Sequence, residues 1–208
     1  MPDNVARSQM IREYLHDSAD TKRQTADECG HAIAAAADLV AQSFRTGGKV
    51  LICGNGGSAA DCQHMAAEFV SRLTKDFDRP GLPAIALTTD TSFLTAFAND
   101  CGFDGVFERQ VQALGRPGDV LIGISTSGNS ANVVRAVRHA RSAGLRSIVL
   151  TGAGGQLAAL ADVAVQVPSN DTQHIQETHL AIEHLICWCV ERDLFPSPVA
   201  VNGLGASA

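Results

Sequence analysis

The sequence predicts an α/β fold: a three-layer αβα sandwich around a five-stranded parallel sheet, preceded by N-terminal helices. Two observations predict it. Five short apolar runs alternate with segments of helical character, which is typical of a parallel sheet covered by helices on both faces. Polar loops directly follow the first and third runs, and in such sheets the loops after the strands meet at one edge, where ligands bind.

The expected elements follow one another in a regular order. Helical character dominates the first forty-odd residues, with a second stretch at 26–44 that Gly47 and Gly48 end. We expect strands at 49–53, 84–87, 120–124, 146–150 and 163–167. We expect further helices at 58–73, 91–98, 106–114, 130–142, 157–160 and 175–192. Residues 1–195 then form a single domain with an N-terminal helical extension, and the small, polar residues 196–208 form a flexible tail.

Composition argues against several classes of protein. The chain of 208 residues carries a formal net charge of -6 and no basic block, which argues against a nucleic-acid partner and against an anionic membrane surface. The N-terminal segment lacks the apolar core of a signal peptide, and no apolar run is long enough to span a bilayer. The six cysteines include no C-x-x-C pair, so we expect reduced thiols and a cytoplasmic protein.

The first loop joins a glycine turn to a helix that carries two chemically active side chains. Asn55, Gly56 and Gly57 directly follow the first strand, and the backbone N–H groups of such a turn can bind an oxyanion. His64 and Glu68 stand four residues apart, so they lie on one face of the next helix. Alone, a His/Glu pair on a helix is more often a solvated ion pair than a functional site.

The last helix offers a second half for this cluster. Gln176 and His184 stand eight residues apart and line one side of that helix. Together with His64 and Glu68 they supply imidazole, carboxylate and amide groups, which can ligate zinc. His179 can supplement the cluster or support it from behind. Three other histidines are assigned to the surface: His16, His31 and His139.

Hydroxyl side chains crowd the loop after the third strand. Ser125, Thr126, Ser127 and Ser130 fall within six positions. Hydroxyls and free backbone N–H groups at a helix N-terminus can bind a phosphate. We therefore favour an anion site over a plain connector in which Ser130 only caps the next helix.

The motifs of several other enzyme classes are absent or incomplete. Ser127 stands where a nucleophile elbow needs its second glycine, and the chain has no P-loop signature. Ala59 replaces the last glycine of a dinucleotide-binding G-x-G-x-x-G, and no acidic residue closes the second strand. A dinucleotide-dependent dehydrogenase is therefore a weak alternative.

Several motifs, in the same order along the chain, resemble those of one family. Three segments carry most of the resemblance: CGNGGSAADCQHMAAEF, GISTSGNSANVV and HIQETHLAIEHLIC. RPGLPAIAL and the pair Asn99-Asp100 add to it. Over nearly its whole length the chain resembles the sedoheptulose 7-phosphate (phosphoheptose) isomerases of the sugar isomerase, or SIS, domain superfamily. The resemblance implies a flavodoxin-like SIS domain and a homotetramer whose active sites lie between subunits.

The resemblance also implies a reaction and the residues that carry it out. The ketose sedoheptulose 7-phosphate would become the aldose D-glycero-D-manno-heptose 7-phosphate, the first step towards nucleotide-activated heptose for bacterial surface polysaccharide such as lipopolysaccharide. One Zn²⁺ per subunit is implied, with the ligands His64, Glu68, Gln176 and His184. The implied substrate contacts are Asn55, Gly56, Gly57, Glu68, Asn99, Asp100, Ser125, Thr126, Ser127, Ser130 and Gln176, with the hydroxyl residues on the phosphate.

Aldose–ketose isomerisation makes chemical demands that these residues can meet. A proton moves between neighbouring carbons through an enediol, which requires a base, an acid for the carbonyl oxygen and neutralisation of the developing charge. We expect Glu68 to be the base and His184 the acid, brought together by the fold or by a neighbouring subunit. Zinc can polarise the carbonyl or orient the sugar hydroxyls, although a carboxylate bound to zinc is a weaker base.

Two comparisons with SIS-domain relatives bear on the function of this chain. Many relatives carry Ala-Arg where this chain has Gln173-His174, a change that affects a contact near the sugar or at a subunit interface. Other SIS-domain relatives are non-catalytic regulators that bind another protein, such as the bacterial replication-initiator-associating protein. Those regulators typically lack the residues that are present here as Glu68 and His184, so the enzyme is favoured over the regulator.

Overall fold

The computed structural model describes residues 4–75 and 77–196 of the chain. In chain order its elements are α1 (Asn4–Arg45), β1 (Val50–Gly54), α2 (Gly57–Val70), β2 (Ala84–Ala86), α3 (Thr91–Cys101), the 3₁₀ helix η1 (Phe103–Gly105), α4 (Val106–Leu114), β3 (Val120–Ser125), α5 (Ala131–Ser142), β4 (Arg146–Thr151), β5 (Val163–Gln166) and α6 (Thr172–Leu194). The five strands form one sheet in the order β2-β1-β3-β4-β5. All neighbouring strands are parallel, which confirms the predicted fold class.

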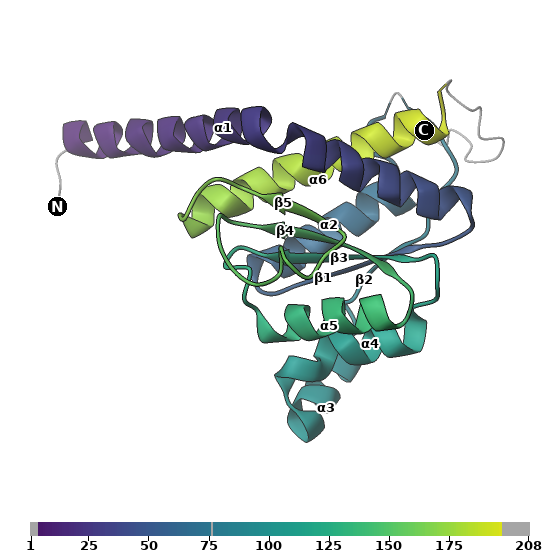
Figure 1. Ribbon diagram of the computed structural model, residues 1–208. Coiled ribbons are helices and arrows are strands. Elements are labelled where there is room, and N and C mark those ends of the chain that lie inside the picture. The colour runs from purple at the N-terminus through teal and green to yellow at the C-terminus, as the bar shows by residue number, and fades with distance from the viewer. Residues whose placement is uncertain (1–3, 76, 197–208) are drawn as a thin grey trace, which may run out of the picture.

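The helices cover the sheet in two layers (Figure 1), with α1, α2 and α6 on one face and α3, α4 and α5 on the other. Alternate residues of β1 enter the two cores because successive side chains of a strand point to opposite faces. Val50 and Ile52 pack with the α1, α2 and α6 layer, whereas Leu51 and Cys53 pack with the α4 and α5 layer. Both faces of the central strands are therefore buried, and their near-continuous apolar sequences follow from that burial.

The order of the strands places the two polar loops side by side. β1 and β3 are hydrogen-bonded neighbours whose register ends at the pair Gly54–Ile124. The chain leaves β1 towards one edge of the sheet and leaves β3 towards the other, so a crevice forms outside their carboxyl ends. The glycine turn 55–57 and the serine loop 125–130 both begin at this point.

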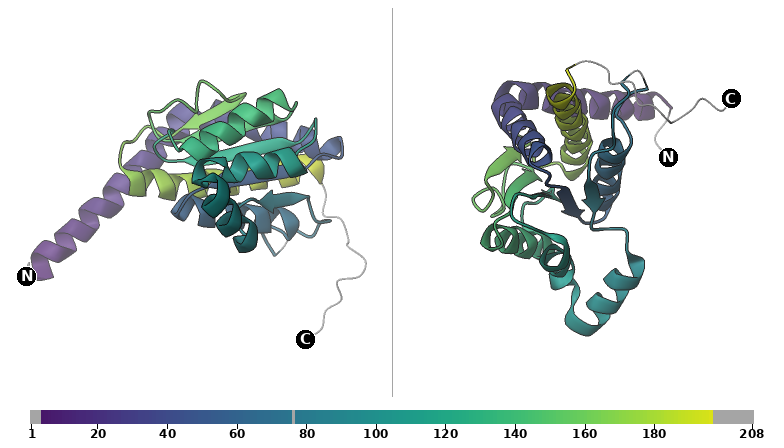
Figure 2. Two further views of the ribbon diagram at one scale, coloured as in Figure 1. Left: turned by 90° about the horizontal axis from the view of Figure 1, so that it is seen from below. Right: turned by 90° about the vertical axis from the view of Figure 1, so that its right-hand side faces the viewer.

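The N-terminal region is one continuous helix, so the prediction of separate N-terminal helices was wrong. α1 runs through Gly30 without a break. A glycine inside a helix costs about 1 kcal/mol relative to alanine, and burial of the flanking Cys29 and Ile33 against the core offsets that cost. The first turns extend beyond the rest of the molecule (Figure 2) and expose apolar side chains.

Other predicted boundaries moved by a few residues, and one predicted helix is absent. Residues 157–160 form a turn in which Leu160 N–H donates to the Leu157 carbonyl at 3.0 Å. Four residues are too few for a stable helix, and Leu157 is apolar because its side chain is buried in the second core. α2 ends at Val70, and α6 begins at Thr172 because Asp171 caps its first turn.

Two further predictions concern membranes and the chain end. Within the described ranges, no helix combines the length and the apolar character that crossing a membrane requires. The predicted tail 196–208 lies outside the described residues, apart from Pro196.

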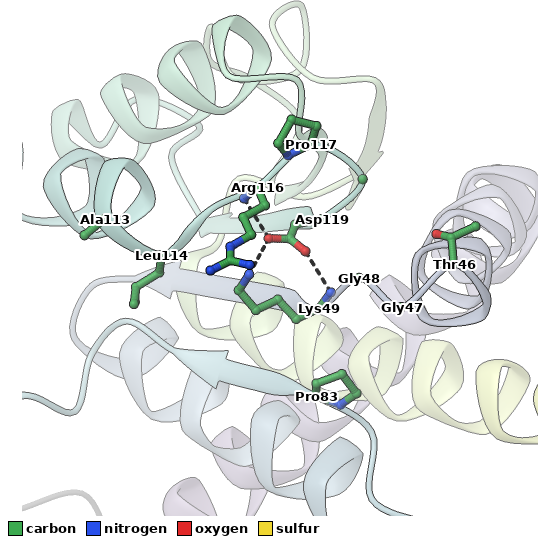
Figure 3. Close-up of a pocket in the computed structure, with 11 residues that line it drawn as sticks. Thr46, Gly47, Gly48, Lys49, Pro83, Ala113, Leu114, Arg116, Pro117 and Asp119 are labelled. Carbon is green, nitrogen blue, oxygen red and sulfur yellow. Dashed lines mark hydrogen bonds and ion pairs between the residues drawn. The ribbon is translucent and has the colours of Figure 1, made fainter.

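The amino ends of the strands are closed by a structural ion pair (Figure 3). Asp119 accepts hydrogen bonds from the backbone N–H groups of Lys49 and Arg116 at 2.9 and 2.8 Å. It also pairs with the Lys49 ammonium at 2.5 Å. A hollow of about 550 Å³ lies beside these residues. Because it sits at the opposite edge of the sheet from the two polar loops, it is not the candidate site.

Candidate active site

The structure brings together the two helical halves that the sequence suggested. α2 and α6 pack against each other, and the Nε2 atoms of His64 and His184 lie 2.8 Å apart. The two rings meet edge to face, with centroids 5.0 Å apart. Glu68 Oε1 lies 3.6 Å from His64 Nε2. Residues 120 positions apart therefore form one cluster.

Glu68 has one oxygen that is buried without a partner. Its side chain is 18% exposed, whereas that of His64 is 43% exposed. Glu68 Oε2 is inaccessible to solvent and has no hydrogen-bond partner among the described residues. Leaving a buried polar atom unpaired costs about 1–3 kcal/mol, so such an atom in a native cleft indicates a place for a proton, a ligand or a cation.

Gln176, near the start of α6, packs against the first turns of α2. Its amide group lies directly against Gly57, where an added Cβ would come 1.7 Å from Gln176 Nε2. Gln176 Nε2 donates to Asp61 Oδ2 at 3.4 Å. Burial raises the pKa of Asp61, while the Gln176 hydrogen bond and the nearby His64 act in the opposite direction. Asp61 was not among the predicted site residues, although its position three residues before His64 puts it on the same helical face.

The donors of this cluster suit zinc. Two imidazole nitrogens, a carboxylate and an amide oxygen form a mixed set of nitrogen and oxygen donors. Glu68 Oε2 has no hydrogen-bond partner among the described residues. Within residues 4–75 and 77–196, no group of three or more His, Cys, Asp or Glu side chains is arranged to hold a metal ion. The types of donor, and not their present arrangement, are what fit zinc here.

The serine loop is organised around Ser125. Its Oγ lies 2.9 Å from Ser130 Oγ and 3.5 Å from Ser127 Oγ. Ser130 occupies the N-cap position of α5 but makes no side-chain capping hydrogen bond, so N–H groups of the first turn of α5 stay available to an anion. Gly128 has a φ of +65°, and an added Cβ there would lie 2.4 Å from the Gly154 carbonyl oxygen. Residues 152–155, which follow β4, thus pack directly against the serine loop at Gly128.

Asn55 ties the glycine turn to the start of α5. Its amide exchanges two hydrogen bonds with the amide of Asn132, both at 2.9 Å. Asn132 is buried, and its Oδ1 also accepts from Val133 N–H. These bonds therefore connect the glycine turn to the helix that follows the serine loop. Asn132 was not among the predicted site residues, because no local pattern distinguishes it from a surface residue in the first turn of a helix.

A hollow of about 450 Å³ opens beside Gln176. Asp61, Gln176, Tyr14, Glu177 and Gln173 are among the residues that line it. Gln173, one of the two positions that depart from the family pattern, therefore lines the same hollow as Gln176 and Asp61. The neighbouring His174 is buried, and its ring packs edge-on against Tyr14 with centroids 4.6 Å apart.

Asn99 and Asp100 do not join the other predicted site residues within one chain. They lie near the end of α3, on the opposite face of the sheet from α2 and α6 (Figure 1). Both are exposed, and the Asn99 amide donates to the Asp100 carboxylate at 2.8 Å. α3 contains no buried residue.

His179 and Glu183 face the protein interior rather than the cluster. His179 is fully buried with Nε2 3.1 Å from the Thr151 carbonyl oxygen, and burial lowers its pKa to about 4. Glu183 is fully buried as well, and burial raises its pKa to about 9. Of the three histidines assigned to the surface, His16 and His31 are exposed and His139 is partly buried.

Comparison with known proteins shows which family this chain resembles over most of its sequence. A family model described as the SIS domain matches residues 13–152. A phosphoheptose isomerase of Roseiflexus sp. (strain RS-1) is 54% identical over 186 residues, which covers 89% of this chain and 93% of that protein. A phosphoheptose isomerase of Rhodospirillum rubrum is 54% identical over 182 residues, covering 87% and 95%.

Solved structures show the same similarity in three dimensions. A phosphoheptose isomerase from Neisseria gonorrhoeae superposes with a TM-score of 0.83 at 46% identity, covering 88% of this chain and 97% of that one. A phosphoheptose isomerase from Francisella tularensis superposes with a TM-score of 0.85 at 38% identity, covering 89% and 98%.

Proposed function

The chain belongs to the phosphoheptose isomerase family of SIS-domain proteins and is an aldose–ketose isomerase of sedoheptulose 7-phosphate in heptose biosynthesis, and we propose that Glu68 and His184 are its base and acid. The observation that carries this assignment is the contact between α2 and α6. It sets the imidazole of His184 beside that of His64, which in turn lies beside Glu68. The product is the aldose D-glycero-D-manno-heptose 7-phosphate.

Glu68 removes a proton from C1 of the ketose and returns it to C2. Removal, with a proton supplied by His184 to the C2 carbonyl oxygen, gives an enediol. Protonation at C2, with return of the O1 proton to His184, then leaves the aldehyde at C1. The two oxygens of Glu68 have different surroundings, because Oε1 faces His64 and Oε2 has no partner. Oε1, on the side of His64, is therefore the oxygen that accepts the proton, because Oε2 is buried away from solvent.

His184 donates a proton to the carbonyl oxygen as the enediol forms. The shared contact between its Nε2 and that of His64 means that one of the two rings holds a hydrogen at the site. A zinc ion held by His64, Glu68, Gln176 and His184, one per subunit, would supply positive charge against the developing oxyanion. The phosphate of the substrate occupies the loop of Ser125, Thr126, Ser127 and Ser130, and Asn55, Gly56 and Gly57 contact the sugar between the two ends.

We further propose that the enzyme is a homotetramer with active sites between subunits. Exposed apolar side chains support this assembly: Val5, Met10, Ile11 and Leu15 on α1, and Leu185 and Trp188 on α6. The exposed α3 would then deliver Asn99 and Asp100 to the substrate of a neighbouring subunit, because within its own chain α3 lies on the other face of the sheet. A cytoplasmic location suits the free thiols of all six cysteines.

The regulator alternative receives no support from the site. Glu68 and His184 are both present and both belong to the cluster. The relatives described above, at 54% identity, are isomerases.

The test is an isomerase assay on purified full-length protein with sedoheptulose 7-phosphate. We expect turnover with added zinc, and loss of turnover after treatment with a chelator. Glu68→Gln and His184→Ala should each lower kcat by about 10²–10⁴-fold, while Glu28→Gln on α1 serves as the matched control. Turnover by Glu68→Gln within twofold of the wild type would contradict the assignment of the base.

A further inference from the structure

Gln176 is an ambiguous ligand because the two ends of its amide have opposite properties. The carbonyl oxygen can accept a hydrogen bond or bind a cation, whereas the NH₂ group donates and repels a cation. A glutamine in a metal-binding cluster therefore needs a neighbour that fixes which end faces the site. The side chain of Gln176 alone does not determine which end of its amide faces the cluster.

Asp61 is the neighbour that determines this. Gln176 Nε2 lies 3.4 Å from Asp61 Oδ2, and an ionised carboxylate only accepts hydrogen bonds. The opposite orientation would set the amide oxygen against a carboxylate oxygen, with no hydrogen between them. Asp61 precedes His64 by three residues and Glu68 by seven, so all three share one face of α2.

Gly57 leaves the space that the amide of Gln176 occupies. An added Cβ at this position would lie 1.7 Å from Gln176 Nε2 and 2.6 Å from Gln176 Cδ. Any other residue there would displace the amide. Gly57 and Asp61 stand four residues apart, one turn of α2, and together they form a seat for the side chain of Gln176.

We infer that Asp61 is a positioning residue that, with Gly57, turns the amide oxygen of Gln176 towards His64, Glu68 and His184. The inference rests on the proposed role of these four side chains as metal ligands. Asp61 acts through Gln176 and not on the reacting atoms of the substrate. Its removal should therefore alter metal affinity and coordination, and not only turnover.

Titration of the metal-free, full-length protein with Co²⁺ tests this, because the visible absorption of Co²⁺ reports both binding and coordination. We expect Asp61→Asn to raise the Kd for Co²⁺ by about 10–100-fold, the usual effect of losing a group that orients a ligand. The control is Asp78→Asn, which makes the same change of charge in the loop after α2 and should bind like the wild type. Gly57→Ala should weaken binding as Asp61→Asn does.

A double variant separates an orienting role from a structural one. In a Gln176→Glu background both ends of the side chain are oxygens, so no neighbour is needed to choose between them. We expect Asp61→Asn not to weaken Co²⁺ binding in that background, although it does so in the wild-type background. A purely structural role of Asp61 predicts the same weakening in both backgrounds. Thermal unfolding of the metal-free variants checks that each of them folds.

The outcomes distinguish this inference from the proposed function. If the wild type binds Co²⁺ while Asp61→Asn binds it within twofold of the wild type, the seat is wrong and the metal cluster stands. Equal weakening by Asp61→Asn in the wild-type and Gln176→Glu backgrounds also overturns the orienting role of Asp61. If the folded wild type takes up no Co²⁺, the cluster itself is wrong and the inference falls with it.

Discussion

The same two helices, α2 and α6, meet in two regions of opposite character. Towards their C-terminal ends the contact is closed: Arg79 and Glu191 are fully buried and pair at 2.8 Å. The Arg79 guanidinium also donates to the carbonyl oxygens of Glu68 and Phe69, both at 2.7 Å. Earlier along the helices the contact is open: His64 is partly exposed, and Glu68 Oε2 has no partner.

The closed region joins the two helices, whereas the open region presents the side chains of the candidate site. Arg79 satisfies carbonyl groups of the last turn of α2, which have no partner within the helix, and it connects them to α6 through Glu191. Glu191 follows His184 by seven residues, two turns along nearly the same face. The buried pair of the closed region stabilises the helix contact, so the open region can keep unpaired polar groups without separating the helices.

Breaking the closed region should have the largest effect on stability. Arg79→Met leaves Glu191 buried without its partner, so we expect the free energy of unfolding to fall by about 3–5 kcal/mol. Urea denaturation measures the loss. The double variant Arg79→Met/Glu191→Leu should lose less, because it removes the isolated charge. A loss below about 1 kcal/mol in the single variant would show that the pair does not hold the helices.

His179 sharpens the comparison, since it lies on α6 but faces the core. Its pKa is about 4 in the folded protein and about 6.5 in an unfolded chain. Between these values the unfolded state binds more protons, so stability falls as the pH is lowered from 6.5 towards 4, by about 3 kcal/mol in all. His179→Gln should abolish this part of the pH dependence, and the exposed His31→Gln should not.

The difference between variant and wild type isolates this effect from that of Glu183. The raised pKa of Glu183, about 9, acts in the opposite sense, because its contribution is lost as the pH rises. Equal pH slopes for His179→Gln and the wild type below pH 6.5, in thermal or urea unfolding, would contradict the account of His179.

The serine loop extends the comparison to the region that we propose binds the phosphate of the substrate. Ser130→Ala removes a hydroxyl that lies 2.9 Å from Ser125 Oγ at the N-terminus of α5. We expect KM for the sugar phosphate to rise about 5–10-fold with kcat nearly unchanged, the loss of one hydrogen bond of about 1–1.5 kcal/mol. Inhibition by inorganic phosphate should weaken by a similar factor. An unchanged inhibition constant would place the phosphate elsewhere.

The order of elements could be predicted from sequence because it depends on local patterns. Apolar runs and glycine turns mark the strands and their ends, and the polar loops after β1 and β3 mark the edge where the site lies. The i, i+4 spacing of His64 and Glu68 and the i, i+8 spacing of Gln176 and His184 each place two groups on one face. That the pair on α2 and the pair on α6 belong to one site was predicted only from the resemblance to a family.

Features that depend on contacts between elements could not be predicted in this way. Leu157 is apolar because it fills the second core, and not because its turn is helical. Asp61 and Asn132 have roles only through partners 115 and 77 residues away. The separation of Asn99 and Asp100 from the cluster follows from the face of the sheet on which α3 lies, which local sequence does not encode.

The role of Glu68 is tested most directly by exchange of substrate hydrogen with solvent. In D₂O, NMR of sedoheptulose 7-phosphate follows deuterium entering C1 of the ketose and C2 of the product through the enediol. We predict that the wild type catalyses this exchange and that Glu68→Gln, folded and still able to bind the sugar phosphate, does not. Exchange by Glu68→Gln at the wild-type rate would contradict the assignment of Glu68 as the base.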